Sequence, residues 1–380
     1  MNSRERVLKA INHKEADRVP IDVGGTLATS MHRIIYHKLK EKFNIRDDKE
    51  EILELALQSV VLDEKVLKKL HGDVLGIYSK PPKSWKMKIN PEDNSYIDEW
   101  GIKYRATRDN LYFDIVDHAL KEVTTEKLDR YNWPDPYDKG RFEGIREKAK
   151  YFYENTDYAI SVGCTFGGGI LQDGAWIIGF ENWFSLLAID QNLAEKIMDK
   201  ILEFHIGYWD AMLSRVGKYV QVVVLGDDLG TQESLFISPE MFRKLIKPRY
   251  KKLIDLIKSK TDVKVLLHSD GAIRALIPDL IEVGIDILNP IQVTARGMGD
   301  TKSLKEEFGK KIVFWGGGCD TQKILPFGKT GDVRREVERR IHDLKPRGGF
   351  VFAPVHNIQP EVPIKNVLTL YETALHCGYY

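Results

Sequence analysis

Ionisable side chains follow several valine- and isoleucine-rich segments of the chain, at the point where each segment ends. His268 directly follows the apolar segment 265–267, Asp270 comes two residues later, and His356 follows another apolar segment, 350–353. Imidazole and carboxylate groups suit zinc, and three protein ligands with an open position are typical of a catalytic zinc site. We therefore interpret His268, Asp270 and His356 as candidate metal ligands. The alternative is structural: His268 ends its strand and Asp270 caps the following helix.

Two adjacent aspartates, Asp227 and Asp228, end the most hydrophobic of these segments. Neighbouring strand residues point to opposite faces, so only one of the two can point straight into a site unless the strand has already turned. A carboxylate there could bind a substrate, accept or donate a proton, or join the metal. We predict Asp227, Asp228 and His356 as catalytic residues. The alternative for the aspartates is a loop-shaping role through bonds to backbone amides.

Further polar or glycine-rich segments end other candidate strands. They predict contacts to a substrate or a flat cofactor by Asn289, Gln292, Gly317, Cys319 and Asn357. The segments 163–169 and 315–319 lack both a phosphate-loop lysine and the dinucleotide-binding glycine spacing, so nucleotide binding is weakly indicated. Their glycines would instead let a flat ligand, or a cofactor carried by a partner, approach the backbone closely. Cys319 is a candidate extra ligand, although a buried, inert cysteine is the commoner outcome.

The elements that position these residues alternate strictly between strand and helix in the second half of the chain. Helical patterns cover 239–259, 273–283 and 332–344, and alternation of this kind indicates parallel strands. Eight strands are predicted, at 19–22, 73–79, 158–164, 219–226, 263–268, 285–289, 311–316 and 349–353. Eight such units predict a (β/α)8 TIM barrel, whose active site lies at the carboxyl ends of the strands. A doubly wound open sheet is the alternative architecture.

The region from about residue 80 to 157 departs from this alternation. It contains a predicted antiparallel piece, in which 85–89 pairs with 96–105, and an irregular connection with two prolines, Pro134 and Pro136. We interpret it as an insertion over one face of the barrel. The whole chain, 1–380, is then expected to form one barrel domain.

Composition restricts the partners and the compartment. The chain has 380 residues, 57 lysines and arginines against 56 aspartates and glutamates, and a net charge of +1, so no global charge favours nucleic acid or an anionic membrane. Only three cysteines, Cys164, Cys319 and Cys377, occur far apart, which indicates a reducing compartment without disulfides. No signal peptide or membrane-spanning stretch is predicted, so a cytoplasmic location is expected. A homodimer is a possible assembly.

Several segments resemble the uroporphyrinogen decarboxylase superfamily. They are Arg4–Ala10 with 17–20, 226–230, 237–240, His268-Ser269-Asp270-Gly271, 277–280, 288–290 and Pro354-Val355-His356-Asn357-Ile358. The resemblance covers nearly the whole chain and implies a TIM barrel. The superfamily divides into cofactor-free decarboxylases and methyltransferases that exchange methyl groups with the cobalamin of a separate corrinoid protein.

The resemblance is greater to the methyltransferase branch. Decarboxylases of this family carry N-terminal arginines that bind the porphyrinogen carboxylates and a catalytic aspartate after Phe-Ser, whereas here the first loop has no arginine before Arg33 and the later strand ends in Tyr78-Ser79-Lys80. The methyltransferases bind zinc through His-x-Cys and a later cysteine. This chain has His268, Asp270 and His356 at those positions, and oxygen and nitrogen ligands leave zinc more electrophilic than thiolates do.

The predicted function is therefore zinc-assisted methyl transfer between a small methylated compound and the cobalamin of a corrinoid protein partner. An O-methyl or N-methyl substrate is favoured over a thiol, because a leaving alkoxide needs a Lewis acid. The alternatives are conversion of uroporphyrinogen III to coproporphyrinogen III without a cofactor, and a non-catalytic barrel that binds a tetrapyrrole or a corrinoid protein.

Overall fold

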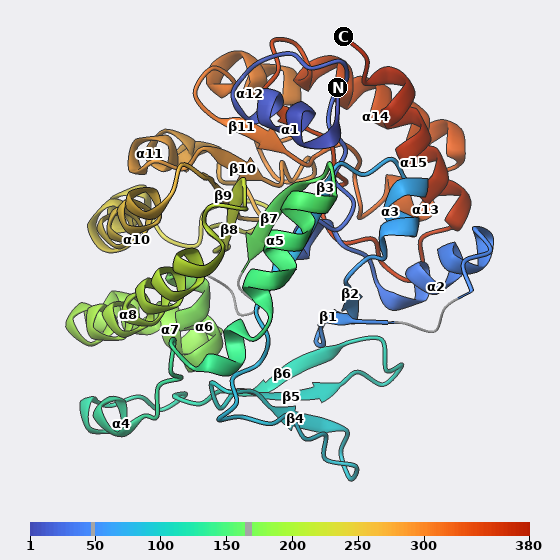
Figure 1. Cartoon of the computed structure of the whole chain (residues 1–380). Helices are drawn as coiled ribbons and strands as arrows, with labels where there is room; N and C mark the ends of the chain where they lie inside the picture. Colours follow the sequence, from blue (N-terminus) through green and yellow to red (C-terminus); the bar gives the residue numbers. More distant parts are fainter. Residues whose placement is uncertain (47–49, 164–168) are drawn as a thin grey trace.

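The computed structural model describes residues 1–46, 50–163 and 169–380. Seven parallel strands form one curved sheet, in which each strand lies beside the next one along the chain (Figure 1). They are β3 (Val74–Tyr78), β7 (Ala159–Gly163), β8 (Val222–Gly226), β9 (Lys264–His268), β10 (Ile287–Asn289), β11 (Val313–Trp315) and β12 (Phe350–Val351). A doubly wound sheet would reverse its order at a switch point, so the observed order confirms the predicted barrel.

The segment predicted as the first strand closes the barrel but is not a regular strand. On one side, Phe352 N donates to Pro20 O and Asp22 N donates to Phe352 O, both at 2.8 Å; on the other, Asp73 N donates to Ile21 O at 2.7 Å. The segment therefore joins β12 to β3 as the eighth member of the barrel. The prediction of eight regular strands is wrong here, because Pro20 has no N–H with which to extend the ladder.

Helices connect the strands, and most of them cover the outside of the barrel sheet (Figure 1). They are α1 (Ser3–Ile11), α2 (Arg33–Lys42), α3 (Glu64–Lys69), α4 (Thr125–Arg130), α5 (Ile145–Asn155), α6 (Leu171–Ile178), α7 (Phe180–Ile189), α8 (Gln191–Val216), α9 (Pro239–Met241), α10 (Lys247–Lys260), α11 (Ile277–Val283), α12 (Thr301–Phe308), α13 (Ile324–Phe327), α14 (Thr330–Leu344) and α15 (Ile364–Cys377). In the part of the chain that the structure describes, no helix combines the length and apolar character needed to span a bilayer.

The helix predicted over 239–259 is not uniform. Its first turn, α9, is followed by a π-helical stretch, Phe242–Ile246, before α10 begins at Lys247. Pro248 lacks the N–H that a regular helix would direct to the carbonyl of residue 244, so the wider helical turn lies just before it.

Strand residues alternate between the inside of the barrel and the layer beneath the helices. On β9, Leu266 belongs to an inner buried cluster, whereas Val265 and Leu267 belong to the larger outer core. Residues of α1 complete the inner cluster, so this helix closes the amino-terminal end of the barrel. The period of two places His268 on the inside, at the carboxyl end.

The predicted insertion is present as a three-stranded antiparallel sheet of β4 (Ser95–Ile97), β5 (Lys103–Ala106) and β6 (Phe113–Asp117). Figure 1 shows this sheet at the end of the molecule opposite α1 and the two chain termini. The predicted pairing of 85–89 with 96–105 is wrong. Residues 96–105 contain a hairpin of their own, because Gly101, at φ +75°, permits a tight turn between β4 and β5. A short hairpin of β1 (Ile52–Glu54) and β2 (Ser59–Val60) lies on the way to β3.

Candidate metal centre

A cavity of about 400 Å³ lies at the carboxyl ends of the strands. The ends of β3, β7, β8 and β9 form its floor, and the inserted sheet, the β1–β2 hairpin and α6 form its walls. The lining residues are Thr26, Leu27, Ala28, Glu54, Ala56, Leu57, Tyr78, Tyr104, Phe113, Asp114, Ile115, Gly163, Gln172, Trp176, Val224, Leu225, Gly226, Asp228, His268, His356 and Asn357. This volume is in the range of small-molecule sites.

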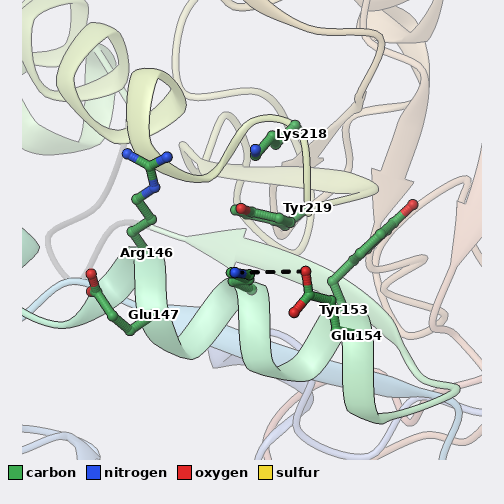
Figure 2. A pocket seen from close by; sticks show the side chains of 7 residues that line it. Arg146, Glu147, Tyr153, Glu154, Lys218 and Tyr219 are labelled. Atoms are coloured by element: carbon green, nitrogen blue, oxygen red, sulfur yellow. Dashed lines mark ion pairs between the residues drawn. The ribbon is translucent and has the colours of Figure 1, made fainter.

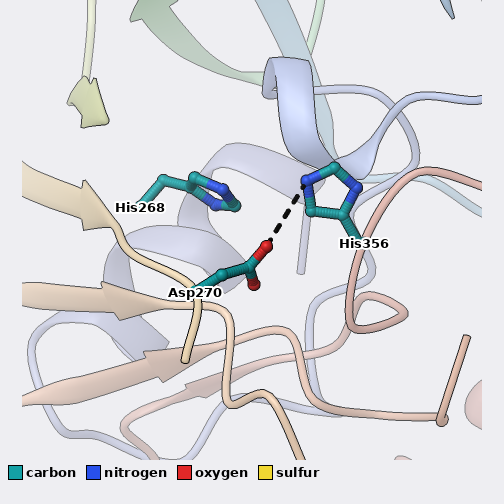
Figure 3. Close-up of side chains that lie close together, drawn as sticks. All are labelled: His268, Asp270 and His356. Carbon is teal, nitrogen blue, oxygen red and sulfur yellow. Dashed lines mark ion pairs between the residues drawn. The ribbon is translucent and has the colours of Figure 1, made fainter. Parts of the chain in front are cut away.

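The three predicted metal ligands lie together here (Figure 3): His268 and His356 line the floor of the cavity, and Asp270 lies beside them. One donor atom from each of His268, Asp270 and His356 lies within 4.8 Å of the other two. His356 Nε2 is 3.9 Å from Asp270 Oδ2, and the two imidazole rings have their centroids 5.4 Å apart. Three such donors converging on one point match the ligand set of a catalytic zinc site.

A chain of two hydrogen bonds orients the ring of His268. Asn289, its neighbour on β10, donates from Nδ2 to the carbonyl of Trp315 at 2.8 Å. The amide oxygen of Asn289 therefore faces His268 and lies 2.7 Å from its Nδ1, which must carry the hydrogen. The lone pair of His268 is consequently on Nε2, as a metal ligand oriented by an outer partner requires.

Burial favours the uncharged forms of His356 and Asp270. Burial and the neighbouring His268 lower the pKa of His356 to about 4, so this imidazole is neutral at pH 7. Burial raises the pKa of Asp270, and its Oδ1 is buried without a hydrogen-bond partner. A buried carboxylate oxygen without a partner is costly, and a bound cation would satisfy it. The donors present therefore fit zinc.

Asp228 lies beside this cluster and lines the cavity. Its Oδ1 accepts the backbone N–H of Asp270 and its Oδ2 accepts Nε2 of Gln172, both at 2.8 Å. Burial raises the pKa of Asp228, whereas His268 opposes that shift. The carboxylate thus holds the loop that carries Asp270 and faces the space where a substrate would lie.

Asp227 points to the opposite face and does not line the cavity. Its carboxylate accepts the backbone N–H groups of Ile170, Leu171 and Gln172, at 2.7 to 3.0 Å, and the hydroxyl of Tyr250 at 2.7 Å. Burial raises the pKa of Asp227 to about 6. These contacts correspond to the loop-shaping alternative: Asp227 caps the start of α6.

The remaining predicted contact residues divide into two groups. Asn357 lines the cavity, and its Nδ2 donates to Leu27 O at 2.6 Å. Gln292, Gly317 and Cys319 lie outside the cavity lining. Gln292 accepts the N–H of Gly271, Gly317 adopts φ +80° against Ile291, and Cys319 is buried, which raises the pKa of its thiol. The predicted glycine-rich contact segment 163–169, with Cys164, falls mostly outside the described residues.

Several lining residues were not predicted. Gln172, whose backbone N–H is one of those capped by Asp227, and Trp176 come from α6, and Tyr104 and Phe113 come from the inserted sheet. The aromatic content of the insertion is the one signal that could have indicated them. These residues lie far from the strand ends along the chain, so the sequence does not show that they line the same cavity.

A second hollow, of about 620 Å³, lies away from the strand ends, beside α5 and the loop before β8 (Figure 2). It is lined by Arg146, Glu147, Lys150, Tyr153, Glu154, Lys218 and Tyr219. Lys150 pairs with Glu154 at 3.9 Å, and the Arg4 guanidinium covers the Tyr153 ring at 4.5 Å. Although this hollow is larger, its charges are exposed and partly paired, so we place the functional site at the strand ends.

A barrel with ionisable groups gathered at the carboxyl ends of its strands is the arrangement of a TIM-barrel enzyme. Residues 117–376, more than half of the chain, match the family model of uroporphyrinogen decarboxylase (URO-D). The chain therefore belongs to the uroporphyrinogen decarboxylase family.

One solved structure supports the fold. A methyltransferase from Methanosarcina mazei is 17% identical, covers 99% of both chains and superposes with a TM-score of 0.67. A GH113 β-1,4-mannanase (9% identity, 93% of this chain, 98% of that chain) and a β-glucosidase mutant (11%, 96% and 94%) both reach only a TM-score of 0.39. No curated protein matches the sequence.

Proposed function

We propose that the protein is a metal-assisted methyltransferase that moves a methyl group from a small O-methyl or N-methyl compound to the cobalamin of a separate corrinoid protein. The observation that carries the proposal is the convergence of His268, Asp270 and His356 at the floor of the cavity. The fold shared with the Methanosarcina mazei methyltransferase supports it. We further propose that the whole chain acts as one barrel domain in the cytoplasm.

Zinc is the proposed cation. His268 Nε2, a carboxylate oxygen of Asp270 and His356 would hold it, and when bound it would supply a Lewis acid for the heteroatom that leaves the methyl group. Asn289 would keep the His268 ring oriented. Asp228, already bonded to the Asp270 loop, would orient the substrate and supply a proton to the departing atom. We assign Asp227 to the support of α6 rather than to the reaction.

Decarboxylation of uroporphyrinogen is the second candidate, because the family model that matches is that of uroporphyrinogen decarboxylase. Its substrate carries eight carboxylates, which require cationic groups for binding. Among the described residues that line the cavity, none is lysine or arginine. Decarboxylation is therefore less well supported than methyl transfer.

The test combines metal content and transfer. Protein purified without chelator is analysed for zinc and then incubated anaerobically with cob(I)alamin and a panel of methyl ethers and N-methyl compounds. We expect one zinc per chain and loss of the Co(I) absorbance with at least one donor. His268→Ala should lose both, whereas Cys319→Ala, outside the cavity, should retain both. Conversion of uroporphyrinogen without metal, together with no methyl transfer, would establish the decarboxylase instead.

A further inference from the structure

The side chains on the walls of the cavity indicate which kind of substrate it can bind. Above the candidate ligands, the cavity is lined by the partly exposed rings of Tyr104, Phe113 and Trp176, with Ile115 and Leu57 beside them. Large apolar side chains gathered around a concave site, and not packed away from solvent, indicate an apolar ligand surface.

The two rings from the inserted sheet are held in place from behind. Tyr96, which is 6% exposed, stacks on Tyr104 with centroids 4.9 Å apart and planes at 7°, and meets Phe113 edge to face at 5.3 Å. The rings of Tyr104 and Phe113 thus form a supported aromatic surface on the cavity side. Flat, fixed rings of this kind favour contact with another aromatic ring.

The carboxylates inside the cavity already accept hydrogen bonds from the protein. No lysine or arginine is found among its described lining residues. Both oxygens of Asp228 accept hydrogen bonds from Asp270 and Gln172, and both oxygens of Glu54 accept backbone N–H groups, at 2.8 Å from Ala56 and 2.5 Å from Leu57. These hydrogen bonds already stabilise the negative charge of both groups, so a cation would gain less from pairing with them than with an unbonded carboxylate.

The remaining carboxylate of the lining is at the solvent edge. Asp114 lies on β6, where its side chain is exposed to solvent. Because water screens this exposed charge, it would repel an anionic substituent and attract a cationic one only weakly. The interior therefore suits an uncharged ring.

We propose, on the basis of the function proposed above, that the methyl donor is an uncharged aryl methyl ether. Its ring lies between Trp176 and the surface formed by Tyr104 and Phe113, and its methoxy group reaches the cluster of His268, Asp270 and His356.

The chemistry of such a donor matches the floor of the cavity. The aryl O–CH3 bond breaks and its electron pair stays on oxygen, giving a phenolate that takes up one proton. The methyl group forms its new bond with the electron pair of Co(I) in the partner corrinoid, and the cobalt becomes Co(III). A phenol has a pKa of about 10, whereas water, which stands here for an aliphatic alcohol, has a pKa of about 16. Phenolate is therefore a better leaving group than an alkoxide, and it still benefits from a Lewis acid.

The experiment measures binding, so it needs neither the corrinoid nor turnover. Calorimetric titrations of the full chain use four probes: 4-methoxyphenol, 4-methoxybenzoate, 4-methoxyphenyl-trimethylammonium and 2-methoxyethanol. We expect 4-methoxyphenol to bind at least tenfold more tightly than the other three. Tighter or equal binding of either charged ring, or of 2-methoxyethanol, would overturn the proposal.

Matched variants assign the binding to the walls. Phe113→Ala should weaken 4-methoxyphenol about tenfold, whereas Val116→Ala, an exposed residue of the same strand, should leave it unchanged. Asp114→Lys should improve the affinity for 4-methoxybenzoate several-fold relative to that for 4-methoxyphenol. Unchanged affinity in folded Phe113→Ala would contradict the aromatic surface. Methyl transfer from aliphatic donors alone would overturn this inference while the proposed function stands; binding of 4-methoxyphenol by a protein that transfers no methyl group would refute the function.

Discussion

At the scale of single residues, the site depends on which side chains share the inside of the barrel. His268 and Asn289 are paired in register on β9 and β10, and Asp228 follows β8 with the same parity. Asp227, one residue earlier, points outward and caps α6. The alternation that separates these neighbours follows from the pleat of the strand.

Asn289 gives a direct test of the orientation of His268. Replacing Asn289 by Ala removes the acceptor for Nδ1–H and leaves the imidazole free to rotate, so zinc affinity should fall 10- to 100-fold, as for other outer partners of metal-bound histidines. Competition with a chromophoric chelator measures this affinity. Cys319→Ala is the control, since that thiol lies outside the cavity, and an equal loss in both variants would contradict the assignment.

The sequence predicted the grouping of the three candidate metal ligands but not the roles of their neighbours. His268, Asp270 and His356 were recognisable because each follows an apolar segment. The sequence did not show which of Asp227 and Asp228 faces the cavity. The alternation of a strand does not say which residues point inside the barrel until the inner cluster of buried residues is known. Gln292 and Cys319 also follow strands, but Gln292 bonds the backbone of Gly271 and Cys319 is buried in the core.

At the scale of elements, α6 is the helix that connects the floor of the cavity to its wall. Asp227 caps its first residues, Gln172 bonds Asp228, and Trp176 faces the cavity from the next turn. On the outer side, Asp173 pairs with His205 of α8 at 2.7 Å, and both side chains are fully buried. The helix is therefore fixed at its start and along its length.

Substitutions of Asp227 and Asp228 should differ in their effect on the free energy of unfolding. Asp227→Ala leaves three backbone N–H groups and the Tyr250 hydroxyl unpaired, and should lower the free energy of unfolding by about 3 kcal/mol or more. Asp228→Asn should cost about 1 kcal/mol or less, since its amide can keep a hydrogen bond with Gln172. Urea unfolding followed by circular dichroism measures both.

The opposite order, with Asp228→Asn as the more destabilised protein, would show that Asp228 is the structural residue. If the assignment holds, Asp228→Asn should instead lower the rate of methyl transfer, because the variant can no longer supply a proton from a carboxyl group.

The inserted sheet was predicted in place but not in detail. Its position between β3 and α5 was visible as a break in the strand–helix alternation. The pairing was wrong, because a region of alternating polar and apolar residues does not specify register without a known buried face. The aromatic side chains on its cavity face acquire a role only from the barrel beneath them.

At the scale of the whole molecule, closure of the barrel depends on the segment between α1 and α2. Asp22 lies in that segment, fully buried, and accepts hydrogen bonds from Trp315 Nε1 at 2.8 Å and Gly25 N at 2.6 Å. Burial raises the pKa of Asp22 to about 6. These contacts tie the closing segment to β11 through the interior of the barrel.

This buried carboxyl group predicts a pH dependence of stability. Between about pH 4 and pH 6 the folded protein retains the Asp22 proton while the unfolded chain loses it, so Asp22 makes the protein less stable as pH rises through this window. One pKa unit corresponds to about 1.4 kcal/mol, which gives a difference of up to about 3 kcal/mol. Urea unfolding of wild type and Asp22→Asn at pH 4.5 and 6.5 measures this difference. The free energy of unfolding should fall less between the two pH values in the variant than in the wild type, and an equal fall in both would contradict the raised pKa of Asp22.

The central claim, that His268, Asp270 and His356 hold a metal that supports methyl transfer, is tested most directly by returning zinc to metal-free protein. The measurement is the rate of methyl transfer to cob(I)alamin as zinc is added in fractions of one equivalent. We predict that the wild-type rate rises from near zero and saturates at one zinc per chain, and that His356→Ala shows no rise. A metal-free protein that is already fully active, or a His356→Ala variant restored by the same single equivalent, would contradict the account.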